Sequence, residues 1–89
     1  MSRSKLGPTL SLSQFLLRQQ VLKQFRTFIR TARKLPDQAQ TSAVIDMVRQ
    51  DFKTYKTIPV KDEDKIKSML SYGERMLKEL KQSAELSEA

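Results

Sequence analysis

The chain has 89 residues, of which 17 are basic and 10 are acidic, and it contains no histidine, cysteine or tryptophan. Imidazole and thiolate metal sites are therefore excluded, as are the Ser-His-Asp and Cys-His arrangements of nucleophilic catalysis. A chain of this length is expected to form one domain. We therefore expect a non-enzymatic, single-domain protein without a metal site.

The composition also indicates the fold class. Apolar residues make up 38% of the chain, below the roughly 45 to 50% of ordinary globular domains. Two glycines, three prolines and scarce β-branched residues favour helices over a β-sandwich or barrel. We predict an all-α fold, an antiparallel three-helix bundle over residues 1–89, whose free monomer is marginally stable. The helices are expected at about residues 12–34, 40–56 and 62–83, with mobile tails at 1–9 and 84–89.

The first helix has both a start and a stop signal. Ser11 and Gln14 have the spacing of a capping box, in which each side chain bonds the backbone N–H of the other residue. Pro36 ends the helix because the residue before a proline avoids the α conformation.

Apolar stripes define the other two helices. The second helix ends before Pro59, and the third begins near Asp62, whose acidic neighbours suit the positive end of a helix dipole. Each helix therefore turns one apolar face toward a common core. The stripe of the second helix consists of Ile45, Val48, Phe52 and Tyr55. That of the third consists of Ile66, Met69, Leu70, Gly73, Met76, Leu77, Leu80 and Ala84.

Positive charge is concentrated in the N-terminal part of the chain. Residues 1–36 contain eight basic side chains and no acidic one, whereas residues 37–89 contain nine basic and ten acidic side chains. Such a block is expected to meet a polyanion, an acidic protein, an anionic membrane surface or a mitochondrial import receptor. No window of 18 apolar residues occurs, so a membrane span is not expected.

Arg18 lies within an apolar stripe of the first helix. A helical wheel places it beside Leu22, Phe25 and Ile29. A charge in this position either extends into solvent or meets an anion, and the pattern leaves both interpretations open.

Further cations accompany the apolar stripes of the first two helices. They form either a solvated face or a surface that binds an acidic helical protein. In the second case, electrostatic attraction would steer the encounter with that protein. On the first helix they are Lys23, Arg26, Arg30, Arg33 and Lys34, and around Phe52 on the second they are Arg49, Lys53 and Lys56.

Gly73 interrupts the apolar stripe of the third helix. A glycine inside a helix costs about 1 kcal/mol relative to alanine, so its presence needs a reason. Close packing against another helix is one interpretation, and space for a ligand chain between helices is the other.

Several segments together resemble the LYR-motif proteins, which are small three-helix mitochondrial proteins. The Leu-Tyr-Arg triplet of that family corresponds to Gln24-Phe25-Arg26, so glutamine replaces the leucine and phenylalanine the tyrosine. The downstream aromatic residue of the family corresponds to Phe52. The resemblance also rests on the segments 4–10, 14–22 and 77–80, and it covers almost the whole chain.

The resemblance implies a function. LYR-motif proteins bind the mitochondrial acyl carrier protein and take the acyl chain of its 4′-phosphopantetheine between their helices. A member of this family would be a non-catalytic adaptor of the mitochondrial matrix that supports respiratory complex assembly, with complex I as the first candidate. The resemblance implies no cofactor of the chain's own, because the phosphopantetheine belongs to the partner.

The resemblance also assigns residues. The residues implied to contact the carrier and its phosphopantetheine are Arg18, Arg49, Lys53 and Lys56. Those implied to form the acyl-chain tunnel are Val21, Leu22, Phe25, Ile29, Ile45, Val48, Phe52, Ile66, Leu70, Gly73 and Leu77.

The alternative is a small basic factor that associates with the mitochondrial ribosome and binds RNA or protein. Aromatic residues interleaved with basic ones would favour RNA binding, but Phe25, Phe28 and Phe52 lie on core stripes. An interfacial membrane helix fits less well, because the capping box and the proline stops specify a folded bundle.

Overall fold

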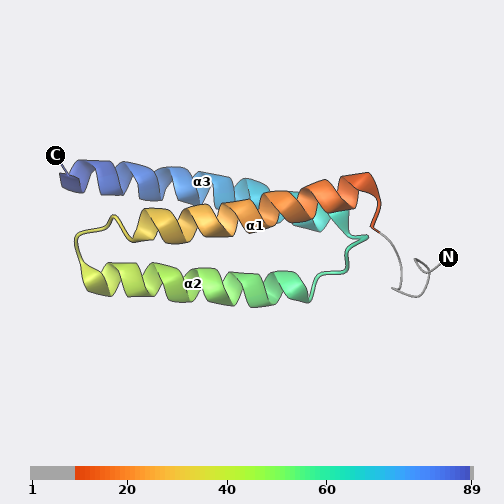
Figure 1. The fold of residues 1–89 in the computed structure, drawn as a ribbon, viewed down its shortest axis with the longest axis horizontal. Helices are drawn as coiled ribbons and strands as arrows, with labels where there is room; N and C mark the ends of the chain where they lie inside the picture. The colour runs from red at the N-terminus through yellow and green to blue at the C-terminus, as the bar shows by residue number, and fades with distance from the viewer. Residues whose placement is uncertain (1–9, 89) are drawn as a thin grey trace.

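A computed structural model describes residues 10–88 of the chain, with side chains over residues 10–86. Three helices run up, down and up: α1 (Leu12–Ala32), α2 (Gln38–Lys56) and α3 (Glu63–Glu88) (Figure 1). The predicted all-α, antiparallel three-helix bundle is confirmed. The tail predicted at residues 1–9 lies outside the described residues.

The ends of α1 and α2 follow from local hydrogen bonds. Gln14 N–H donates to the Ser11 hydroxyl and Ser11 N–H donates to Gln14 Oε1, both at 3.1 Å, so the predicted capping box is present. The helix ends at Ala32, slightly before the predicted residue, and a turn precedes Pro36. Asp37 then caps α2, because its carboxylate accepts a 2.9 Å bond from the N–H of Ala39.

The C-terminal end of α3 corrects one prediction. The helix was expected to end near residue 83 and a mobile tail to follow, but α3 continues to Glu88. Ala84 is only 4% exposed and lies one turn after the half-buried Leu80, so the apolar stripe extends beyond the predicted end. No glycine or proline follows Gly73, so nothing in this segment stops the helix.

Helix α1 lies between the other two helices (Figure 1). It packs against both α2 and α3, whereas the contact between α2 and α3 is slight, and the molecule measures 56 × 20 × 18 Å. Within the described residues, α2 contributes a single buried residue, Val48. The core is therefore small and is built mainly from α1. The buried apolar residues are Leu17, Val21, Phe25, Phe28, Ala32, Val48, Ile66 and Ala84.

Candidate functional site

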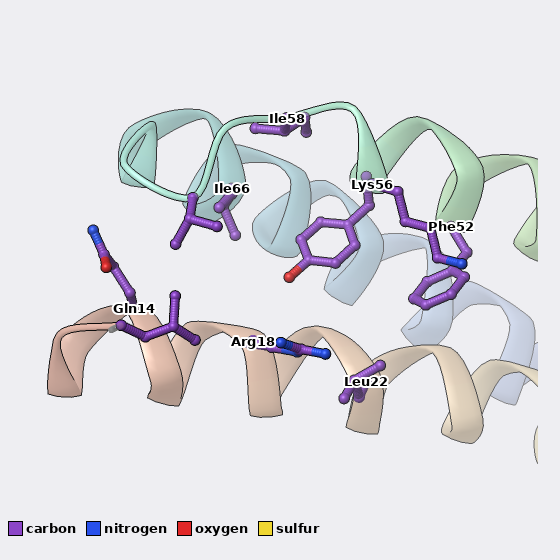
Figure 2. A pocket seen from close by; sticks show the side chains of 10 residues that line it. Gln14, Arg18, Leu22, Phe52, Lys56, Ile58 and Ile66 are labelled. Atoms are coloured by element: carbon purple, nitrogen blue, oxygen red, sulfur yellow. The ribbon is translucent and has the colours of Figure 1, made fainter. Parts of the chain in front are cut away.

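A cavity of about 220 Å³, here called the first cavity, lies where the start of α1 faces the end of α2. Figure 2 shows Arg18 on α1 and Lys56 on α2 on facing sides of this space. Apolar side chains supply most of its wall, and the loop between α2 and α3 closes one end. The lining residues are Leu10, Gln14, Arg18, Leu22, Phe52, Tyr55, Lys56, Ile58, Val60 and Ile66.

Helical spacing brings these side chains together. Gln14, Arg18 and Leu22 are spaced by four residues, so they form one row along α1 that faces α2 (Figure 2). Gln14 is held in this row by the capping box at the start of the helix. Lys56 is the last residue of α2, one turn after Phe52, so its side chain reaches the edge of the cavity.

The cavity combines an apolar interior with two unpaired cations. Lys56 Nζ lies 4.8 Å from the centre of the Phe52 ring, a cation–π distance that leaves its N–H groups available to an anion. Arg18 is exposed, and among residues 10–88 neither it nor Lys56 forms an ion pair with a carboxylate. This arrangement suits an anionic group bound beside apolar surface.

Two aromatic rings in the wall of the first cavity, Phe52 and Tyr55, contact a third ring, Phe25. The ring centres of Phe25 and Phe52 are 5.3 Å apart at an interplanar angle of 87°, an edge-to-face contact. Tyr55 lies 6.5 Å from Phe25 and 6.0 Å from Phe52. We call these three side chains the aromatic trio.

A second cavity of about 130 Å³ lies on the other side of Phe25, between α2 and α3. Its floor comes from α1 and its walls from the other two helices. Three of the chain's four methionines line it. The lining residues are Gln24, Phe25, Phe28, Met47, Asp51, Thr54, Met69, Tyr72, Gly73 and Met76.

The side chain of Gln24 explains the glycine in α3. Its Nε2 donates a 3.0 Å hydrogen bond to the carbonyl of Leu70, one turn before Gly73. A Cβ at Gly73 would collide with the amide of Gln24, which fills the space above the glycine. Of the two interpretations of Gly73, close helix packing therefore accounts for the missing side chain, and the glycine also lines the second cavity.

The four cations assigned to carrier binding are not equivalent in the structure. Arg18 and Lys56 line the first cavity, whereas Arg49 and Lys53 are exposed on α2 and line neither cavity. Their contact with a partner stays a prediction.

The eleven residues assigned to the acyl-chain tunnel fall into three groups. Leu22, Phe52 and Ile66 line the first cavity, and Phe25 and Gly73 line the second. Five others belong to the packed core or lie partly buried against it, namely Val21, Ile29, Val48, Leu70 and Leu77. Ile45 is half-buried, but its neighbour Val44 packs against the core cluster in its place. An acyl path through these six residues stays a prediction.

The sequence-based assignment missed several cavity residues. The loop residues Ile58 and Val60 were overlooked because they lie outside the helical stripes. Met69 and Met76 were placed on a stripe but not at a site, and Met47 was not singled out. The recurrence of three methionines near the middle of two helices is the signal that was available, since methionine is common at adaptable apolar surfaces.

The fold is a small three-helix bundle with an apolar cavity flanked by two cations. Residues 19–79 match the family described as Complex 1 protein (LYR family). This match covers more than half of the chain, and the chain belongs to the LYR family. Family membership supports a mitochondrial protein that associates with larger complexes.

Individual relatives agree with this assignment. The chain is 37% identical over 90 residues to LYR motif-containing protein 2 of Pongo abelii, and both chains are covered completely. It is 36% identical over 90 residues to the protein of the same name from Homo sapiens, again with complete coverage of both chains. The protein of that name from Danio rerio is 38% identical over 88 residues, which are 98% of each chain. No solved structure matches the chain.

The structure also bears on the membrane question raised by the positive charge. Within residues 10–88, none of the three helices has both the length and the apolar character that a membrane span requires. Each helix instead has one apolar face, which packs in the bundle.

Proposed function

We propose that this chain is a non-catalytic adaptor of the mitochondrial matrix that binds acylated acyl carrier protein and supports the assembly of a respiratory complex. Complex I is the first candidate client. The observation that carries the proposal is the first cavity, in which Arg18 and Lys56 flank an apolar interior. Family membership supports the same partner class.

The proposed ligand matches the cavity in two respects. The phosphate of 4′-phosphopantetheine is an anion, and Arg18 and Lys56 supply donors for it from facing helices. Burial of an acyl chain contributes about 0.8 kcal/mol per methylene, so about a dozen methylenes contribute on the order of 10 kcal/mol before the costs of association. Such a ligand would complete a core to which α2 contributes only Val48 among the described residues.

The prosthetic group provides the direct test. The chain is titrated by calorimetry with acyl carrier protein in three forms: without phosphopantetheine, with phosphopantetheine alone, and with a dodecanoyl chain attached. We expect affinity to rise in this order, because the second form adds the phosphate and the third adds the buried chain. Equal affinity for the three forms, or no binding, would contradict the proposal.

The client is tested separately by affinity purification from mitochondria, with mass spectrometry of the proteins and of the acyl-phosphopantetheine recovered. We expect acylated carrier together with subunits of a respiratory complex. Recovery of ribosomal RNA without the carrier would favour the alternative. That alternative is supported by exposed cations on α1, including Lys23, Arg26 and Arg30. Phe25 and Phe28 are buried, so these two rings are not available to stack on bases.

A further inference from the structure

The aromatic trio stands between the two cavities. Phe52 and Tyr55 line the first cavity, and Phe25, which contacts both rings, lines the second. Helix α3 also contributes residues to both cavities. Ile66 of α3 lines the first cavity, and Met69, one turn later, lines the second. The trio is therefore the partition between two apolar spaces of one bundle.

We propose that the aromatic trio acts as a gate for the acyl chain and that the second cavity receives the distal part of a long chain after Phe52 and Tyr55 move aside. This inference rests on the proposed function, because it concerns the same acyl carrier ligand. It makes Phe52 a determinant of chain-length preference. A short chain would end in the first cavity, and a longer chain would reach the methionines of the second.

The burial of the three rings indicates which of them move. Phe25 is 9% exposed and belongs to the core cluster, whereas Phe52 and Tyr55 are only half-buried at the edge of that cluster. An edge-to-face contact is worth about two- to tenfold in an equilibrium constant. Each buried methylene is worth about fourfold, so one or two methylenes offset the loss of one ring contact.

The second cavity is suited to a flexible apolar chain. Met47, Met69 and Met76 have unbranched side chains that repack around an irregular occupant. Met47 is 40% exposed, so its side chain can turn outward into solvent. The amide of Gln24, which lines this cavity, donates a hydrogen bond to the Leu70 carbonyl, so this polar group of the wall has a partner.

Two substitutions with opposite expected effects test the gate. Carrier loaded with butyryl, octanoyl, dodecanoyl or hexadecanoyl chains is titrated into the parent chain, Met47→Trp and Phe52→Leu. Met47→Trp fills the second cavity and should lower affinity for the longest chain by about tenfold, the value of one to two methylenes, with butyryl affinity within about twofold. Phe52→Leu thins the partition, so the ratio of hexadecanoyl to butyryl affinity should rise by about fourfold or more.

Gln50→Trp is the matched control, because Gln50 is exposed on α2 and lines neither cavity. It should leave the chain-length dependence of the parent unchanged. Circular dichroism of each variant checks that the helices are intact. Equal effects of Met47→Trp at every chain length, including carrier without an acyl chain, would show that this surface contacts a protein instead and would overturn the gate. Absence of carrier binding by the parent would overturn the proposed function itself.

Discussion

Replacing Gly73 with alanine tests the packing of Gln24 against α3. Alanine is favoured over glycine in a helix interior by about 1 kcal/mol. The added Cβ would occupy the place of the Gln24 amide, so the glutamine has to turn away and lose its bond to the Leu70 carbonyl. The loss of such a bond costs about 1 kcal/mol. The two terms nearly cancel, so Gly73→Ala alone should change the free energy of unfolding by less than about 0.5 kcal/mol.

The effect of Gly73→Ala on stability should differ when position 24 is alanine. In Gln24→Ala the space above the glycine is vacant, so Gly73→Ala should then stabilise the protein by the full value of about 1 kcal/mol. For a domain of this size, that difference corresponds to a melting temperature about 4 to 8 °C higher. The coupling between the two substitutions in a double-mutant cycle should therefore be about 1 kcal/mol.

The cycle is measured by thermal unfolding of the parent, the two single variants and the double variant, followed by circular dichroism. All four are compared at one fixed concentration of trimethylamine N-oxide, which favours the folded state of a marginal protein. If Gly73→Ala stabilises the protein equally with glutamine and with alanine at position 24, the glutamine does not occupy the space above the glycine, and the explanation given for Gly73 is wrong.

Three other predictions concern binding, stability and the end of α3. Arg18→Ala should weaken binding of acylated carrier by a few kcal/mol, because the partner anion is left unpaired, and Arg18→Lys should restore only part of this loss. Calorimetry at two salt concentrations measures both affinities. A larger loss of affinity in Lys34→Ala would show that the docking face is wrongly assigned. The chain expressed alone should be unstable or aggregated and should become monodisperse when it is co-expressed with acylated carrier, whereas a sharp melt at high temperature that carrier does not change would contradict this. Ala84→Glu should lower the melting temperature because it places a charge at a position that is 4% exposed, and an equal effect of Glu85→Lys would show that burial is not the cause.

The sequence predicted those parts of the fold that depend on local signals. The capping box at Ser11, the prolines at positions 36 and 59 and the spacing of apolar residues fixed the number and order of helices. The end of α3 was predicted too early because no residue there marks a stop, and helix ends without such signals depend on packing. The apolar stripe already included Ala84, which is buried, although the helix was expected to end one residue earlier.

The site was predicted less completely than the fold, for a similar reason. Arg18 was identified because a charge within an apolar stripe stands out in one helix. The pairing of Gln24 with Leu70 joins residues 46 positions apart, and periodicity within a helix carries no information about such a contact. The division of apolar residues between two cavities likewise depends on how the helices are set against one another.

The slight contact between α2 and α3 has a consequence for the kinetics of ligand entry. Because α1 contacts the other two helices separately and α2 contributes only Val48 to the buried residues described, we expect α2 to open more readily than α3. Amide hydrogens of α2 should then exchange with solvent faster than those in the middle of α1. If a long acyl chain enters only during such openings, its rate of insertion should reach a plateau as the carrier concentration rises, and that plateau should equal the opening rate of α2.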